Sequence, residues 1–148
     1  FTNSSFARTQ ATFIAENLAE RMRANPDAII NGDYAGFNSS NSIGSCTARP
    51  AQYCEVTGSS AATSCTSAQL ATFDLYQAVC GSGGSETGSA ARDVLPNGQV
   101  SVACNDAPCI ATSTYTLTVS WDETNASNVN GAIDDVTNTQ STQFIITP

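Results

Sequence analysis

The chain has 148 residues, a net charge of −8 and a pI of about 4.1, and charged residues make up 12% of it. This length suits a single domain. The sequence contains no His and no Lys, which excludes Ser-His-Asp and Cys-His catalysis, Schiff-base chemistry, P-loop phosphate binding and His-based metal sites. With this net negative charge, the chain lacks the basic surface that binding to nucleic acid or anionic lipid requires. We therefore expect a non-enzymatic domain that takes no cofactor and binds no nucleic acid.

Cysteine is the most informative residue type in the composition. An even number of cysteines in a small chain rich in Ser and Thr predicts a disulfide framework formed in an oxidising compartment. No pair has the C-x2-C spacing and no His is available as a ligand, so a zinc site is disfavoured. The cysteines are Cys46, Cys54, Cys65, Cys80, Cys104 and Cys109.

Residues 5–24 carry apolar side chains at helical spacing and predict an amphipathic helix about 30 Å long. Arg21 and Arg23 fall in its last turn, and Pro26 ends it. The two arginines either complement the helix dipole or contact the acidic groups of a partner. The predicted packing face consists of Phe6, Phe13, Ile14, Leu18 and Met22.

The segment 26–64 shows no periodicity and predicts a long ordered loop tied down by Cys46 and Cys54. Thr66 and Gln69 have the spacing of a capping box, which predicts a short helix running to about Val79. A Gly- and Ser-rich connection follows at residues 81–85.

The last third of the chain predicts a small antiparallel sheet. The turn residues 95–98 lead into two strands with alternating apolar side chains, near 100–104 and 115–121, and a further strand is expected at 143–146 after a polar stretch at 122–142. The hairpin tip between the first two strands would be closed by a local Cys104–Cys109 disulfide. The predicted sheet core is Val100, Val102, Tyr115, Leu117, Val119 and Trp121.

Few residues are candidates for catalysis, metal binding or ligand binding. Adjacent acids on a strand point to opposite faces, so neither Asp122-Glu123 nor Asp134-Asp135 forms a catalytic pair by itself. The oxygen-rich segment 122–135 resembles a calcium loop in composition, but Ala126 would occupy the first ligand position, so no metal site is expected. Tyr115 and Trp121 could form a binding platform, although their place in the alternation favours the core.

Several motifs, taken in order, resemble the PilV-type minor pilins of bacterial type IV pili. The runs Arg8–Ala11, Ala19–Pro26 and Gly32–Tyr34 match the end of that family's first helix. A cysteine before a short helix, Asp74-Leu75 within it, the turn 95–98 and the strand Tyr115–Asp122 match downstream landmarks. Tyr76-Gln77 stands where a Trp often follows the Asp of the short helix.

The resemblance implies an α+β, pilin-like fold with a long N-terminal helix packed on a small antiparallel sheet, a disulfide-tied loop region and a second short helix. Residues 1–25 would be the C-terminal half of the pilin helix, 26–93 the loop region and 94–148 the sheet, within one domain. The family's apolar first half is absent, so the chain resembles a truncation expected to be monomeric in solution. The resemblance does not fix the other disulfides, since six cysteines are more than the family leads us to expect. Six cysteines allow fifteen pairings, and Cys46–Cys65 with Cys54–Cys80 is our working expectation among them.

The resemblance also implies a function. The expected role is that of a minor pilin subunit in type IV pilus assembly or priming, at or near the pilus tip, with other minor pilins and the major pilin as partners. The domain would lie in the periplasm, anchored in the inner membrane by the missing half-helix, and later outside the cell in the pilus. The alternatives are a type II secretion minor pseudopilin and a secreted adhesin or binding module.

Overall fold

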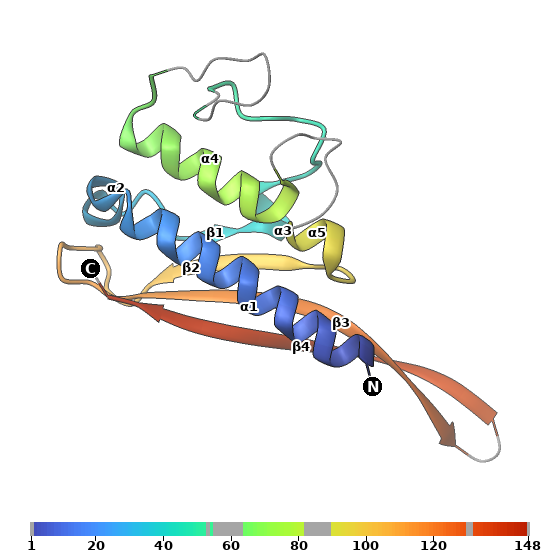
Figure 1. Ribbon diagram of the computed structural model, residues 1–148. Helices are drawn as coiled ribbons and strands as arrows, with labels where there is room; N and C mark the ends of the chain where they lie inside the picture. Colours follow the sequence, from blue (N-terminus) through green and yellow to red (C-terminus); the bar gives the residue numbers. More distant parts are fainter. Residues whose placement is uncertain (1, 53, 55–63, 82–89, 130–131, 148) are drawn as a thin grey trace.

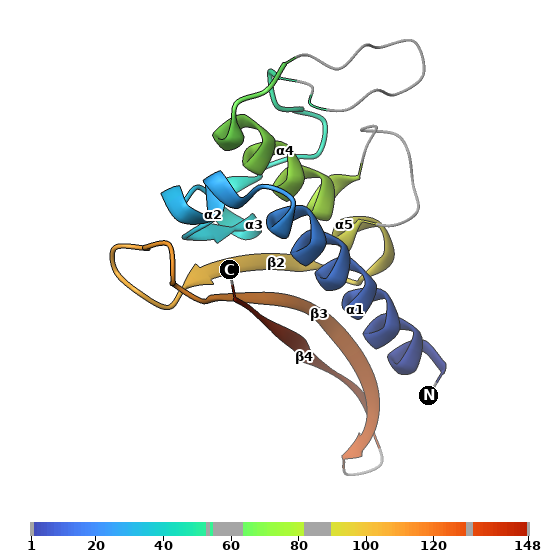
Figure 2. The same ribbon diagram turned by 60° about the vertical axis from the view of Figure 1, so that its left-hand side comes forward.

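The computed structural model describes residues 2–52, 54, 64–81, 90–129 and 132–147. Its architecture is α+β, with a long N-terminal helix lying across one face of a four-stranded antiparallel sheet of order β1-β2-β3-β4 (Figure 1). The shorter helices lie beside the long helix, on the β1 side of the sheet, whereas the Cys104–Cys109 loop lies at one end of the sheet (Figures 1 and 2). Within the described residues, no helix has both the length and the apolar character needed to cross a membrane.

Helix α1 spans Thr2–Arg23, so it begins three residues before the predicted start. Its 22 residues correspond to about 33 Å. Asn25 has a non-helical backbone conformation (φ −124°, ψ 65°), as expected for a residue that precedes a proline. The two arginines of the last turn are at the helix end predicted from the sequence.

The predicted packing face of α1 is right for three residues and wrong for two. Ile14, Leu18 and Met22 are buried, whereas Phe6 and Phe13 are 58% and 69% exposed. At 100° per residue, Phe13 and Met22 lie about 180° apart around the helix, so they cannot share one face. Alanines complete the buried face instead, because their small side chains let the helix approach the bulky residues of the sheet; they are Ala7, Ala11, Ala15 and Ala19.

The segment expected to be a long loop contains regular elements. Helix α2 (Pro26–Asn31) follows α1 directly, with Pro26 at its start and Gly32 ending it in the left-handed conformation (φ 76°). Strand β1 (Phe37–Asn38) and helix α3 (Ser39–Ser42) come next. The expectation of an irregular loop was wrong here because such short elements leave too few residues for a period to appear in the sequence.

Helix α4 (Ser67–Cys80) begins at the predicted capping box. The Thr66 hydroxyl accepts from the Gln69 backbone N–H at 3.2 Å, and the Gln69 side chain accepts from the Thr66 N–H at 2.9 Å. Helix α5 (Ala91–Val94) precedes the turn at 95–98. Gly98 is required there, since a Cβ at this position would lie 2.0 Å from the Ala91 carbonyl oxygen.

Strands β2 (Gln99–Cys104) and β3 (Tyr115–Val129) pair antiparallel, with Val100 opposite Val119 and Val102 opposite Leu117. The inward side chains of these strands meet α1 in one core. All six residues predicted for the sheet core are buried: Val100, Val102, Tyr115, Leu117, Val119 and Trp121.

The C-terminal hairpin is longer than predicted. Strand β4 spans Ala132–Ile146 and pairs with β3 over 15 residue pairs, from Tyr115↔Ile146 to Val129↔Ala132. The segment 122–142 is therefore mostly strand and not the expected polar connection, and the described residues of the oxygen-rich segment 122–135 lie in the ladder of β3 with β4. The strands were missed because residues 122–142 are rich in Thr, Asn and Ser and show no alternation of apolar and polar residues in the sequence. The backbone of this hairpin projects beyond the other strands of the sheet (Figure 1).

Three disulfides join the six cysteines: Cys46–Cys80, Cys54–Cys65 and Cys104–Cys109. The hairpin-tip pair Cys104–Cys109 has the connectivity expected from the sequence. The expected Cys46–Cys65 and Cys54–Cys80 pairs are wrong. Cys80 ends α4 and packs in the core beside the segment that carries Cys46, whereas Cys54 and Cys65 are only 11 positions apart along the chain.

Candidate functional site

The candidate site is the face of α1 that points away from the sheet. Phe6 and Phe13, seven residues apart, lie almost in line along it. Two large aromatic side chains aligned on one helix face give this face an apolar character of the kind that marks interaction sites. Beside Phe13, a hollow of about 160 Å³ lies between α1 and α4, lined by Gln10, Phe13, Ile14, Asn17 and Arg21 on one side and Gln77, Ala78 and Gly81 on the other.

A polar network fixes the C-terminal end of this helix to the rest of the domain. Asp74 on α4 is 2% exposed. Its Oδ1 accepts from Arg21 Nη1 at 3.3 Å, and its Oδ2 accepts from the Tyr34 hydroxyl at 2.7 Å. Arg21 also donates to the Gln77 side chain. The network therefore joins α1, α4 and the segment after α2 through one buried carboxylate.

Asn25 extends the network at the end of α1. Its side-chain N–H donates to the Tyr34 hydroxyl oxygen at 3.2 Å and to the Ser67 carbonyl at 2.9 Å. Asn25 is itself buried, so these bonds satisfy a group that would otherwise be costly to bury. The sequence interpretation of Arg21 as a dipole complement or a partner contact missed this intramolecular role, because Asp74 lies 53 residues away.

The surroundings of two buried tyrosines raise the pKa values of their hydroxyls. Burial, together with the hydrogen bond to the Asp74 carboxylate, raises the pKa of Tyr34 above its ordinary value of 10.0. Burial, with the charge of Asp33, raises the pKa of Tyr115, whose hydroxyl donates to the Ile29 carbonyl at 2.6 Å. Both groups are therefore held neutral as structural hydrogen-bond donors.

The N-terminal half of α1 is held to β3 by a separate contact. Glu123 Oε1 accepts from the Ser4 hydroxyl at 2.9 Å and from Trp121 Nε1 at 3.1 Å. The Arg8 guanidinium lies 5.9 Å from the centre of a Trp121 ring. The helix is thus attached at both ends, which holds its outward face at a fixed angle to the sheet.

The acids singled out in the sequence do not form a catalytic pair in the described residues. Asp122 accepts from Asn97 at 3.0 Å and from Thr139 at 2.8 Å on the outer face of the sheet, whereas Glu123 points toward α1. Asp134 and Asp135 have side chains outside the description. No cluster of three His, Cys, Asp or Glu suited to a metal ion occurs in the described part of the chain.

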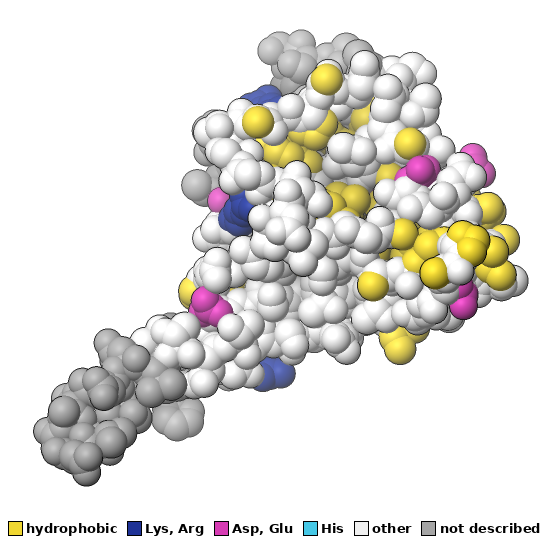
Figure 3. Space-filling view, turned by 180° about the vertical axis from the view of Figure 1, so that it is seen from behind, with side chains coloured by type: hydrophobic (Ala, Val, Ile, Leu, Met, Phe, Trp, Pro, Cys, Tyr) yellow, Lys and Arg dark blue, Asp and Glu magenta, His cyan; other side chains and the backbone are white. Residues whose placement is uncertain are grey.

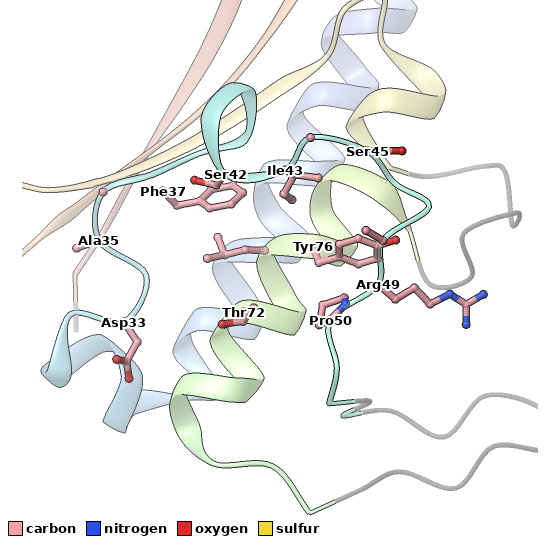
Figure 4. A pocket seen from close by; sticks show the side chains of 14 residues that line it. Asp33, Ala35, Phe37, Ser42, Ile43, Ser45, Arg49, Pro50, Thr72 and Tyr76 are labelled. Carbon is pink, nitrogen blue, oxygen red and sulfur yellow. The ribbon is translucent and has the colours of Figure 1, made fainter.

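A pocket of about 550 Å³ lies on the other side of α4 (Figure 4). Phe37, Ile43, Leu75 and Tyr76 supply an apolar lining, and Asp33 lies at the opposite end of the pocket from Arg49. The Tyr76 hydroxyl donates to the Cys46 carbonyl at 2.5 Å. The sequence offered no signal for this pocket, because most of its lining comes from residues 33–50, which lack periodicity, and only the folded chain places them against α4.

Arg92 and the Cys46–Cys80 disulfide hold the upper wall of this pocket in place. The Arg92 guanidinium donates to the Ser39 carbonyl at 3.2 Å and to the Ile43 carbonyl at 2.6 Å. Ser39 in turn accepts from the Val100 backbone N–H at 2.9 Å. The segment 39–46 is therefore bound to the sheet, α4 and α5 by side-chain contacts and a covalent link.

A second exposed apolar area lies at the end of the molecule that carries the Cys104–Cys109 loop (Figure 3). Ile30 on α2 is 46% exposed and Ile110 after the loop is 53% exposed. The two segments are adjacent, because a Cβ built on Gly32 would lie 3.4 Å from Cys109 Cβ. The broad middle of the same view, over the outer face of the sheet, is mostly uncharged.

This architecture, with one long helix held across an antiparallel sheet and an outward face left uncovered, defines the class of pilin subunits. A family model described as Type IV pilin Tt1218 (Tt1218-like) matches residues 2–76. The chain belongs to this type IV pilin family. The match runs from the start of α1 into α4 and includes Arg21, Tyr34 and Asp74 of the polar network. No curated protein and no solved structure gives a significant match.

Proposed function

We propose that this chain is the globular domain of a PilV-like minor pilin that takes part in priming type IV pilus assembly. It acts at or near the pilus tip, where its partners are other minor pilins and the major pilin. Type IV pilins are in general structural subunits without enzymatic activity. Before assembly the domain lies in the periplasm, anchored through its precursor, and afterwards it is part of the extracellular filament. Away from partners it is monomeric.

The observation that carries this proposal is the exposure of Phe6 and Phe13 on a helix whose other face is fully packed. Burying apolar side chains of this size against neighbouring helices contributes about 1.5–3 kcal/mol each. The attachment of α1 to Glu123 at one end and Asp74 at the other means that contacts on the helix orient the whole domain. The PilV-like assignment is supported by the motif resemblance.

The test is made in the organism that encodes the chain. Deleting the gene should reduce the number of pili per cell, and the wild-type gene should restore it. A Phe6→Ser, Phe13→Ser variant should fail to restore piliation while the purified domain melts within a few degrees of wild type. The matched control is Ile30→Ser with Ile110→Ser, which removes exposed apolar residues elsewhere and should restore piliation.

The position of the subunit in the pilus and the secretion or pilus system to which it belongs are tested separately. Antibody-linked gold should label fibre ends, and labelling along the whole fibre would contradict the tip assignment. Normal piliation in the deletion strain together with lost protein secretion would instead identify a type II secretion pseudopilin.

One observation favours a second role, that of a binding module. The pocket between α4 and residues 33–50 has the size of known ligand sites and combines an apolar lining with one acid and one guanidinium at its ends. A Phe37→Ser variant with normal piliation and reduced cell adhesion would support binding there. Unchanged adhesion would leave assembly as the only proposed function.

A further inference from the structure

The two edges of the sheet differ sharply in how they are protected. β1 forms one edge with only two residues, and its Asn38 side chain accepts from the Ser40 backbone N–H at 3.1 Å to cap α3. The chain therefore leaves the sheet at once on that side. Such a short edge strand is a common way to prevent pairing with other chains.

β4 forms the other edge, and its residues 136–146 lack the charges, prolines and bulges that usually protect an edge strand. It is 15 residues long and its register with β3 continues without a bulge. It contains no Lys, Arg or Pro, and residues 136–146 carry no charged side chain. These eleven residues offer an unpaired row of backbone groups about 36 Å long. No described part of the chain lies along the far side of β4 in either ribbon view (Figures 1 and 2).

The side chains along β4 alternate in a way that suits a further strand. Phe144 and Ile146 point to the helix side, where Ile146 is buried and Phe144 is partly buried against the core. Gln143 and Ser141 point to the outer face, as does Ile145, which is 69% exposed. A strand added here would place alternate apolar residues beside Phe144 and extend the core.

We propose that β4 accepts an extended segment of another polypeptide as a fifth strand of the sheet. The occupant is neutral or basic along the paired segment and has apolar side chains at alternate positions. The expected charge of the occupant follows from the charge of this chain. The chain carries a net charge of −8, which repels an acidic segment, whereas residues 136–146 carry no charge and do not repel a neutral or basic one. Main-chain hydrogen bonds supply the affinity, and the alternating side chains supply the specificity.

The proposal is tested with the purified chain and a synthetic probe. The probe copies residues 115–121, Tyr-Thr-Leu-Thr-Val-Ser-Trp, flanked by lysines. This sequence already pairs with the inner edge of β4 in the folded chain, with its apolar residues on the helix side. The control peptide carries Thr118→Pro, which removes a backbone donor and blocks strand pairing.

Amide hydrogen exchange gives the site-specific readout. The probe should slow exchange by about tenfold at alternate residues between 138 and 146, and the proline peptide should not. No protection there at millimolar probe, or equal protection by both peptides, would overturn the proposal. Sedimentation of the chain alone should show a monomer. A dimer dispersed by Ser141→Lys would show that a second copy occupies the edge, which also contradicts the proposed occupant.

Charge variants give an independent check. Ser141→Lys with Gln143→Lys should weaken binding of the basic probe by about tenfold, because the two new positive charges would repel the lysines that flank the paired segment of the probe. The matched control is Thr9→Lys with Glu16→Gln, which makes the same change in net charge on exposed positions of α1. That variant should change affinity by less than about twofold. Equal losses in both variants would indicate non-specific electrostatic binding and refute edge pairing.

Discussion

The Tyr34 hydroxyl donates a 2.7 Å hydrogen bond to Asp74 Oδ2, joining residues 40 positions apart in the buried interior. Both residues are among the motifs that carried the family resemblance. Asp74 also accepts from Arg21, so a single carboxylate links α4 to the end of α1 and to the segment after α2. The recurring motif residues therefore act in this chain as a structural junction that sets the direction of the long helix.

Removing that carboxylate should be costly. Asp74→Ala leaves Tyr34 and Arg21 without their shared acceptor in a buried site, and we expect the free energy of unfolding to fall by about 2–4 kcal/mol. Urea denaturation at neutral pH measures the loss. Glu16→Ala, which removes the same charge from an exposed position of α1, is the control and should stay within about 0.5 kcal/mol of wild type. A similar loss in both variants would contradict the role given to the network.

The buried tyrosines predict an alkaline limit to stability. Because folding raises the pKa of Tyr34 and Tyr115 above 10.0, the folded state retains protons that the unfolded state releases. Their contribution is complete below pH 10 and is lost as the pH rises further, at up to about 1.4 kcal/mol per pH unit for each tyrosine.

Tyr34→Phe separates this effect from general alkaline damage. At pH 7 the variant should be less stable than wild type by about 1–2 kcal/mol, since Asn25 and Asp74 lose a partner. Above pH 10 its stability should fall less steeply than that of wild type. Urea denaturation at a series of pH values gives both quantities, and parallel curves would show that Tyr34 does not contribute to the alkaline limit.

The disulfide connectivity can be checked directly. Mass mapping of the non-reduced protein should find Cys46–Cys80, Cys54–Cys65 and Cys104–Cys109. The first link closes a sequence separation of 34 and the second one of 11. Chain entropy then gives about 3.8 and about 2.8 kcal/mol. Replacing Cys46 and Cys80 with Ser should lower the urea midpoint more than replacing Cys54 and Cys65, and the reverse order would contradict this assignment.

The two faces of α1 should respond in opposite ways to substitution. Ala15 is fully buried against the sheet, so Ala15→Leu should overpack the interface and lower the free energy of unfolding by about 1–3 kcal/mol. Phe13→Leu on the exposed face should change it by no more than about 0.5 kcal/mol. Thermal melting of the two variants beside wild type measures both effects. Strong destabilisation by Phe13→Leu would place that side chain in the core.

The sequence alone determined the elements whose signals are local. The capping box at Thr66 and Gln69 located the start of α4, Pro26 marked the end of α1, and alternation along 115–121 identified the core side of β3. Each signal lies within a few residues of the feature it predicts. The α+β fold class followed from the order of these elements together with the family resemblance.

Tertiary structure decided the features that depend on distant partners. The alanine face of α1 is buried in place of Phe6 and Phe13 because close approach of the helix to the sheet favours small side chains. Cys46 pairs with Cys80 because packing brings the end of α4 to that loop. The burial of Asp74 and the open edge of β4 could not be predicted from the sequence for the same reason. Periodicity and spacing describe one segment at a time, and only the folded chain shows which segments meet.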